Sequence, residues 1–568
     1  MKFFPRIRRP NFFKKKAFRH YEIAPDEIFL DATNVSGFDR GRFQGRLELP
    51  IPSGAFVGLF VSLGVIAIVI LLQAGKLEIV NGSAYAKESR QNHIRSSVLF
   101  APRGIIVGVN GTVLVDNKED AQGNVRREYL FPQMGSIIGY VSYPKKDSSG
   151  RYYDIVEKGI AGLEAQYNTM LTGSSGTILT EVNAVGKIYS QGTIVPSHKG
   201  KTLLLSIDAK SESALTKALS DVAKRNDFQS GGAVLMNVRT GAIRAIASYP
   251  TYNANVLSSG YPAKTIASYS TDTRHPYLDQ AVQGLYAPGS IVKPFIAAGA
   301  LTDGIITPNT TIDDKGFLII KDPYHPGKIF LYKGWKALGV LAVRKAIAWS
   351  SDVFFYTVGG GFGSQKGLGI KRLDYWYHQF GIGDKTGVDL PNEREGLVPT
   401  PAWKERVLHK QWYLGDTYFT AIGQYAMLVT PIQMARAIAA VANGGKLLTP
   451  TLLADASPKF RTIPVSHANF KVVREGMREA VTSALAWQIN FPYLAIAAKT
   501  GTAQVGIRNQ YDNSWIEGFY PYSNPHYAFA VVLGRGPSGK GEDATTVMKE
   551  FFQTLHAQGL LASSTPSH

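Results

Sequence analysis

The sequence predicts an α+β protein with a single N-terminal transmembrane helix, an elongated α+β pedestal and a larger domain in which helices cover an antiparallel sheet. Three observations predict this fold class. An uncharged run near the N-terminus is long enough to cross a bilayer, and a chain of 568 residues exceeds the usual size of one domain. Strand patterns also open and close residues 229–560 around a helical middle.

The predicted membrane helix covers residues 53–74. Its centre, Gly54 to Leu72, carries no charged side chain, and nineteen residues at 1.5 Å each match a hydrocarbon core about 30 Å thick. A helix in a soluble core would rarely be apolar on every face. A cleaved signal peptide would begin closer to the N-terminus and end at a cleavage site. We therefore expect this run to anchor the protein in a membrane.

Residues 1–52 are a predicted cytoplasmic tail. The first fifty residues hold 11 Lys or Arg against 6 Asp or Glu, and the positive-inside rule places such a segment in the cytoplasm. The first twenty residues interleave Phe with Lys and Arg, which suits both an anionic membrane surface and a solvated, disordered tail. The remainder of the chain is then expected on the far side of the membrane.

Residues 75–228 are a predicted non-catalytic α+β pedestal. Residues 76–98 are polar with a helical pattern, and short β-like runs alternate with turns after them. A second helical stretch closes the segment. The predicted strands lie at 104–108, 111–115 and 201–206, and the predicted closing helix at 210–225.

Residues 229–560 are the predicted second domain, followed by a short tail at 561–568. The domain opens with a β-hairpin whose strands flank Arg239-Thr-Gly241. Two strands return near its end, which implies a sheet assembled from both ends of the domain. The predicted later strands are 494–505 and 526–534, and the predicted helices are 290–302, 340–350, 431–443 and 544–558.

Charge and composition exclude several kinds of function. The net charge of +19 raises the question of nucleic-acid binding, but no nucleic-acid motif accompanies it, and we expect anionic membrane and envelope polymers as partners instead. The chain has no cysteine, so it has no disulfide, no thiol catalysis and no cysteine metal site. Its 11 histidines form no paired metal motif, and we expect neither a metal nor a cofactor.

Three short strings carry the candidate chemistry. They are Ser290-Ile-Val-Lys293, Ser350-Ser351-Asp352 and Lys499-Thr500-Gly501-Thr502. They supply a serine nucleophile with a lysine base, a second hydroxyl beside a carboxylate, and a cationic strand for an anionic substrate end. Together these are the components of a serine acyl-transfer site.

Sequence context distinguishes these strings from copies elsewhere in the chain. Ser290 follows the Pro288-Gly289 turn and opens an apolar helical run, so that Lys293 lies one turn along the same face. Pro294 is tolerated only in the first turn of that helix. The other Ser-x-x-Lys match, Ser142 to Lys145, is an expected exposed turn.

The Lys-Thr-Gly triplet also occurs twice. The copy at 385–387 lies in a glycine-rich loop, whereas Lys499 follows small apolar residues that predict a buried strand. We assign the site to Lys499. For Ser350 and Asp352 the pattern leaves two compatible roles open, a helix N-cap and a place in the site.

Residues 229–560 resemble the transpeptidase domain of class B penicillin-binding proteins. The three strings occur in that family's order, with the surrounding phrases Pro288-Gly289, Ser351 to Tyr356, Lys499 to Gln504 and Gly518-Phe519. The pedestal resembles the family's non-catalytic, dimerisation-type domain as well. Its matching phrases are 101–105 with Asn110-Gly111, and 162–164 with 171–173 and 181–183.

Within that family the chain is similar to the elongation-type group, penicillin-binding protein 2. Asp352 stands where many relatives have Asn, and further matching phrases occur at 399–404, 412–417, 422–424 and 430–434. Division-type members usually have Tyr-Gly-Tyr-Gly where this chain has Thr-Ala-Ile-Gly. Only about 150 residues separate the span from residue 229, too few for the glycosyltransferase domain of class A members.

The resemblance implies a peptidoglycan D,D-transpeptidase. Ser290 would attack the bond between two terminal D-alanines, Lys293 would take its proton, and Ser350 would pass a proton to the departing amine. Asp352 and Lys499 would set the local field. Lys499, Thr500, Gly501 and Thr502 would bind the terminal carboxylate, and the Ser290 and Thr502 N–H groups would form an oxyanion hole.

The resemblance also implies partners and a location. Expected partners are peptidoglycan stem peptides, β-lactam antibiotics, the membrane, and a multi-spanning glycan polymerase of the shape, elongation, division and sporulation family, with no nucleic acid. The expected location is the bacterial cytoplasmic (inner) membrane, with the catalytic domain outside the cytoplasm. Alternatives are a division-type enzyme, a D,D-carboxypeptidase or β-lactamase-like hydrolase, a non-enzymatic β-lactam or muropeptide receptor, and a scaffold with an inactive site.

Overall fold

The computed structural model describes residues 52–91, 94–119, 125–148, 152–182, 188–322, 325, 327–539 and 541–561. The chain divides into two compact units, residues 1–94 and 95–568. The predicted cytoplasmic tail and C-terminal tail lie outside the described residues, apart from Pro52 and Leu561.

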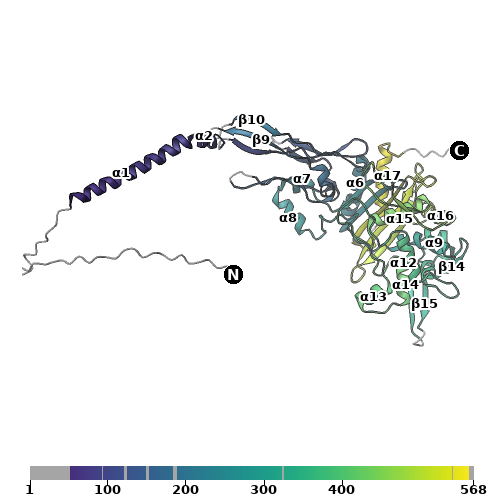
Figure 1. Ribbon diagram of the computed structural model, residues 1–568. Coiled ribbons are helices and arrows are strands. Elements are labelled where there is room, and N and C mark those ends of the chain that lie inside the picture. Colours follow the sequence, from purple (N-terminus) through teal and green to yellow (C-terminus); the bar gives the residue numbers. More distant parts are fainter. Residues whose placement is uncertain are drawn as a thin grey trace, which may run out of the picture. The chain divides into compact units, whose positions relative to one another are not determined.

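The first unit holds the predicted membrane helix. Helix α1 (Ser53–Gly75) continues through a π-helical turn, η3 (Lys76–Val80), before helix α2 (Gly82–Gln91) (Figure 1). The side chains of α1 are mostly apolar, and they are exposed on every side of the helix, as expected for a helix that faces lipid. Within the described part of the chain, α1 with η3 is the one helix that is long and apolar enough to cross a membrane.

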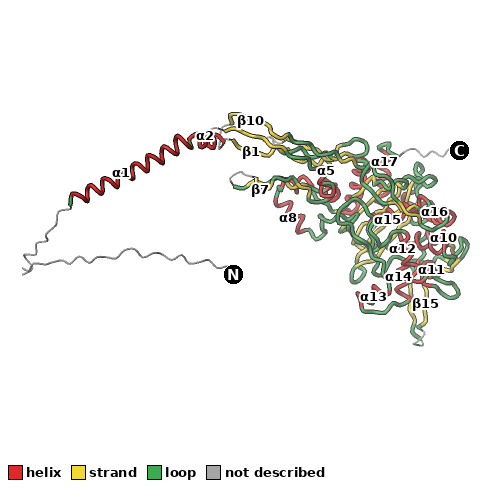
Figure 2. Tube along the Cα trace, in the orientation of Figure 1, coloured by secondary structure: helices red, strands yellow, loops and turns green. Residues whose placement is uncertain are grey.

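The described residues of the pedestal form two larger sheets, ordered β1-β9-β10 and β11-β2-β3-β4. Figure 2 shows β1 and β10 of the first sheet among the strands drawn in yellow. The predicted helix over 76–98 is partly wrong, because β1 begins at Ile94 and joins the first sheet. The strands of these sheets are β1 (Ile94–Leu99), β2 (Ile106–Val107), β3 (Val113–Glu119), β4 (Val125–Tyr129), β9 (Gly176–Val182), β10 (Ile188–Val195) and β11 (Leu203–Leu204). Short helices are α3 (Gly135–Ile138), α4 (Gly162–Gln166) and α5 (Asn168–Leu171), and two-stranded pairs are β5 (Val141–Ser142) with β8 (Lys158–Gly159) and β6 (Lys145–Lys146) with β7 (Tyr152–Asp154).

A buried charge cluster explains two of the pedestal phrases. Arg103 donates to Glu164 at 2.6 Å and Arg127 donates to the other carboxylate oxygen at 2.7 Å, with all three side chains essentially inaccessible to water. Arg103 also bonds Thr172 and Asn168. The ion pair between Arg103 and Glu164 joins the segments 101–105 and 162–164, which are about sixty positions apart in the chain. Loss of either partner would leave an uncompensated buried charge, so the pair should be important for the stability of the pedestal.

The second domain is built on a five-stranded sheet with the order β13-β12-β22-β21-β20, and every neighbouring pair is antiparallel. The expected assembly of a sheet from both ends of the domain is confirmed. The middle strand of the closing trio, β21, was not predicted. The strands are β12 (Ser230–Asn237), β13 (Ile243–Tyr249), β20 (Ala497–Val505), β21 (Tyr511–Tyr520) and β22 (Tyr527–Pro537).

The two faces of this sheet pack against different helices. On one face, Leu235, Ile516 and Val531 pack with residues of α6 (Ala209–Arg225) and α17 (Ala544–Ala557). The alternate residues of the same strands, such as Val234 and Val532, join the core of the helical middle. Helix α6 therefore packs on the sheet of the second domain, whereas the sequence analysis assigned residues 210–225 to the pedestal.

The helical middle covers the face of the sheet that carries the candidate site (Figure 1). The predicted helix 340–350 is partly wrong, because residues 339–342 form strand β17, which pairs with β14. The helices are α7 (Ala254–Ser259), α8 (Ala263–Thr271), α9 (Lys293–Thr302), α10 (Val343–Ala348), α11 (Asp352–Gly360), α12 (Gly369–Gln379), α13 (Pro401–Leu408), α14 (Leu414–Ala421), α15 (Pro431–Asn443) and α16 (His467–Ser483). Short strand pairs are β14 (Thr311–Asp314) with β17 (Gly339–Ala342), β15 (Phe317–Lys321) with β16 (Ile329–Lys333), and β18 (Lys446–Leu448) with β19 (Phe460–Thr462).

Candidate active site

Ser290 lies where a tight turn becomes a buried helix. A 3-10 turn, η5 (Gly289–Val292), leads directly into α9, and Pro294 lies in the first turn of that helix, as the sequence predicts. Gly289 has a φ of +58°, a conformation that suits glycine. The Ser290 side chain is half-buried and faces a cavity, so it is held in place and remains accessible to a substrate.

Lys293 is completely buried and joins the first string to the second. Its Nζ donates to the Ser350 carbonyl at 2.8 Å, to Ser350 Oγ at 3.2 Å and to Asp352 Oδ1 at 2.7 Å. Burial lowers the pKa of Lys293, and the Asp352 carboxylate opposes part of that change. A lowered pKa is the direction that a lysine base needs, because more of the neutral amine is then present near neutral pH.

In the middle string, one residue caps a helix and the other two contribute to the candidate site. Ser351 caps α11, accepting from the Phe354 N–H at 3.0 Å and donating to Asp314 at 2.5 Å. Ser350 has a φ of +57° and a buried hydroxyl, and Asp352 is the first residue of the helix. Because Ser351 supplies the cap, Ser350 and Asp352 are left to contact Lys293.

Lys499 approaches the same hydroxyl from the sheet. It lies on the edge strand β20, is 1% exposed, and donates from Nζ to Ser350 Oγ at 3.0 Å and to the Thr500 carbonyl at 2.5 Å. Burial lowers the pKa of Lys499 well below its ordinary value, and the Lys293 ammonium lowers it further. Two lysines from distant parts of the chain thus contact one serine hydroxyl.

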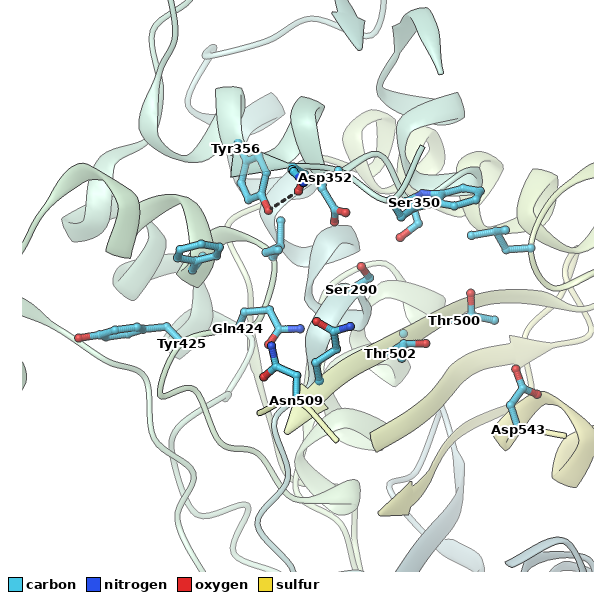
Figure 3. Close-up of a pocket in the computed structure, with 18 residues that line it drawn as sticks. Ser290, Ser350, Asp352, Tyr356, Gln424, Tyr425, Thr500, Thr502, Asn509 and Asp543 are labelled. Carbon is cyan, nitrogen blue, oxygen red and sulfur yellow. Dashed lines mark hydrogen bonds between the residues drawn. The ribbon is translucent and has the colours of Figure 1, made fainter. Parts of the chain in front are cut away.

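A cavity of about 900 Å³ lies over these groups. Figure 3 shows Ser290 between Ser350 and the strand that carries Thr500 and Thr502. The structure therefore brings the three predicted strings together around one space. Lining residues that the sequence analysis did not assign are Lys333, Gly334, Trp335, Tyr356, Phe419, Ile422, Gln424, Tyr425, Leu485, Gln504, Asn509 and Asp543.

The duplicate motifs lie elsewhere. In the loop at 385–387, Glu393 accepts from the N–H groups of Thr386 and Gly387, so this Lys-Thr-Gly closes a turn. Ser142 lies in strand β5, paired with β8, and not in the expected exposed turn. Among the described residues that line the cavity, none belongs to either duplicate.

A family comparison agrees with this geometry. Residues 231–553 match the family model described as the penicillin binding protein transpeptidase domain, which is more than half of the chain, and residues 120–205 match the penicillin-binding protein dimerisation domain. The chain belongs to the penicillin-binding protein transpeptidase family. The second match falls within the predicted pedestal.

Similar proteins place the chain in the elongation-type, penicillin-binding protein 2 group. Peptidoglycan D,D-transpeptidase MrdA of Escherichia coli strain K12 is 31% identical over 476 residues, covering 77% of this chain and 72% of MrdA. The division-type alternative has weaker support, since the transpeptidase FtsI of the same strain is 27% identical over 436 residues, covering 72% of this chain and 67% of FtsI.

Two solved structures share the fold. One is the complex between penicillin-binding protein 2 and MreC from Helicobacter pylori, with a TM-score of 0.68 and 25% identity over 82% of this chain and 99% of that chain. The other concerns a peptidoglycan synthase complex that coordinates polymerisation and crosslinking, with a TM-score of 0.69 and 25% identity over 90% of this chain and 100% of that chain.

Gly289 couples the turn that carries Ser290 to the Lys-Thr-Gly strand. A Cβ at this position would lie 2.6 Å from the Thr502 carbonyl oxygen, so Gly289→Ala should displace the strand from Ser290. We expect the rate of acylation by penicillin to fall roughly ten- to a hundredfold, because a displacement near 1 Å at a reacting centre costs about that much. Stopped-time labelling of the full chain measures this rate.

Gly304→Ala is the matched control. Gly304 also has a positive φ, +68°, but a Cβ there would meet nothing within 4 Å. Both variants place an L-residue in the left-handed region at a cost of about 1 kcal/mol. Equal acylation rates in the two variants would show that contact with Thr502 is irrelevant.

Proposed function

We propose that this chain is a serine D,D-transpeptidase that cross-links peptidoglycan stem peptides through an acyl-enzyme on Ser290 during cell-wall elongation. The observation that carries the proposal is the contact of both Lys293 and Lys499 with the Ser350 hydroxyl, beside Ser290 and under an open cavity. The nucleophile and base of the first string, the proton relay of the second and the cation of the third are thereby gathered in one place.

In the first step, Ser290 Oγ attacks the carbonyl carbon between two terminal D-alanines, and the neutral Lys293 amine accepts the serine proton. As the tetrahedral intermediate collapses, the peptide C–N bond breaks, Ser350 passes its proton to the departing D-alanine amine, and Lys293 returns the proton it has accepted to Ser350. An ester to Ser290 remains. An amine from a neighbouring stem peptide then attacks this ester, forms the cross-link and returns the proton to the serine.

The strand β20 suits the anionic end of such a substrate. Thr500 and Thr502 line the cavity, and the buried Lys499 reaches the Ser350 hydroxyl, which also lines it. A cation with two hydroxyls forms charge-assisted hydrogen bonds to a terminal carboxylate, and the Gly501 backbone permits close approach. The N–H groups of Ser290 and Thr502 would hold the oxyanion, each worth about 3 kcal/mol.

The cavity favours transfer to an amine over hydrolysis. A class A β-lactamase uses a glutamate to activate water. Among the described residues that line this cavity, the carboxylates are Asp352 and Asp543. Asp352 is paired with Lys293, and Asp543 accepts from the first N–H groups of α17. Each is bonded to the protein through one oxygen, and no glutamate is among the described lining residues, so a β-lactam adduct on Ser290 should be long-lived.

The remaining assignments follow from the anchor and the related structures. α1 would hold the chain in the cytoplasmic membrane with residues 1–52 inside and the catalytic domain outside. The related structures favour two partners: an MreC-like protein, because MreC is bound in one of them, and a glycan polymerase, because the other concerns a synthase complex that coordinates polymerisation and crosslinking. For the domain bounds, the packing of α6 favours ending the pedestal before Ala209, ahead of the predicted boundary at 228.

Labelling with a fluorescent penicillin, followed by peptide mass mapping, tests the proposal on the full chain in detergent. We expect one label per chain, on Ser290, that persists for at least one hour. Rapid loss of the label would support a β-lactamase-like hydrolase instead, and reversible binding without a covalent adduct would support a receptor.

A further inference from the structure

A buried glutamate lies on the strand next to the Lys-Thr-Gly strand, and no step of the proposed mechanism uses it. Glu517 is on β21 and is 0% exposed. Neither of its carboxylate oxygens has a hydrogen-bond partner among the described residues, and it forms no ion pair within 4 Å there. Burying a carboxyl group without a partner is costly, so a group kept in this state needs an explanation.

The register of the sheet relates Glu517 to Lys499. The two residues are directly opposite in the β20–β21 ladder, so their side chains leave the same face of the sheet as near neighbours. On the other side, Glu517 faces Ala530 of β22, and Trp515 and Phe519 flank it along β21. Its near surroundings are thus apolar, apart from Lys499.

The other charged groups of the site lie beyond Lys499. Lys293 comes from α9, Asp352 from α11 and Asp314 from β14. Asp352 pairs with Lys293 at 2.7 Å, and Asp314 accepts from Ser351. Both aspartates are therefore engaged on the Lys293 side, which leaves Glu517 as the carboxyl group facing Lys499 from the sheet.

Burial acts against both charges of this pair. It raises the pKa of Glu517 well above its usual range, and the Lys499 ammonium opposes that rise. It lowers the pKa of Lys499, the Lys293 ammonium lowers it further, and the Asp352 and Glu517 carboxylates oppose that fall. Each charge therefore supports the other, and the two groups titrate as a coupled pair.

We propose that Glu517 is a positioning residue that shares a buried proton with Lys499, so that when the site binds the carboxylate of its substrate the proton lies on Lys499 as an ammonium and Glu517 is its counter-ion. It touches neither the substrate nor Ser290 and acts through Lys499 alone. The inference rests on the proposed function, because it assumes that Lys499 binds an anion during acylation.

The test is the pH dependence of acylation by a penicillin that carries a free carboxylate, in Glu517→Gln and Glu517→Val. Without the glutamate charge Lys499 loses its proton at lower pH, so the alkaline limb should move down by about one pH unit. We expect rates within about twofold of wild type at pH 6.5 and about tenfold lower at pH 8.5. Valine fits a buried strand, so it covers the case in which Gln fails to fold.

Glu212→Gln is the matched control. Glu212 is also fully buried, but it lies on α6, against the other face of the sheet, and accepts from Ile246 N–H and Thr216. Its loss should change stability and leave the pH profile in place. If both Glu517 variants retain the wild-type profile, the inference fails while labelling of Ser290 stands. If wild type is not labelled at all, the proposed function fails.

Discussion

Ser290→Ala should abolish both covalent labelling by penicillin and peptide cross-linking, with rates at least about four orders of magnitude below wild type. Alanine removes the only atom of this residue that can form the ester, and Lys293 and Lys499 remain bound to the Ser350 hydroxyl, which they already contact. Ser290 is half-buried and the substitution is small, so the fold should persist. Gel fluorescence and intact mass of the full chain measure the loss.

Ser142→Ala provides the matched control, because Ser142 heads the other Ser-x-x-Lys string of the chain. It lies in strand β5 and outside the cavity lining, so its loss should leave labelling within about twofold of wild type, as for other substitutions away from a site. A fluorescent adduct that persists in Ser290→Ala would overturn the assignment of the nucleophile. Loss of labelling in Ser142→Ala alone would transfer the assignment to the other string.

Local physics explains why the three strings could be found in the sequence. A Pro-Gly turn before an apolar run predicts the start of α9, and small apolar residues before Lys499 predict β20. These signals depend on neighbours in the chain. The contacts of the two lysines with Ser350 could not be predicted in this way. Lys293 is 57 residues and Lys499 is 149 residues from Ser350 in the chain, and packing between such distant elements leaves no local pattern.

Other features lacked a local signal. β21 reads Tyr-Asp-Asn-Ser-Trp-Ile-Glu-Gly-Phe-Tyr, whose polar residues resemble a loop, and only burial between two strands makes it central to the closing trio. Glu517 lies in this unpredicted strand, so its burial was not predicted either. In the middle string, Ser350, Ser351 and Asp352 are all good caps by type, so the sequence could not show that Ser351 takes this role. The packing of α6 on the sheet was also not predicted. An amphipathic pattern shows that one face of a helix is buried, but it does not show which element covers that face.

Lys293→Met should lower the rate of penicillin acylation by about three orders of magnitude, the upper part of what a general base contributes. Methionine preserves the volume of the side chain in a fully buried position. It removes the amine that bonds the Ser350 carbonyl, the Ser350 hydroxyl and Asp352, and it leaves that carboxylate without its counter-ion. Rapid-quench labelling of the full chain measures the rate, and thermal unfolding reports the accompanying loss of stability.

Lys293→Arg separates the base from the charge. Arginine restores a cation beside Asp352 but stays protonated at any working pH, so it should recover part of the stability and none of the acylation. Lys345→Met, on the exposed side of α10, should match wild type in both measurements. Acylation by the arginine variant at near wild-type rates would show that Lys293 acts through its charge alone, and the proton of Ser290 would then need another acceptor.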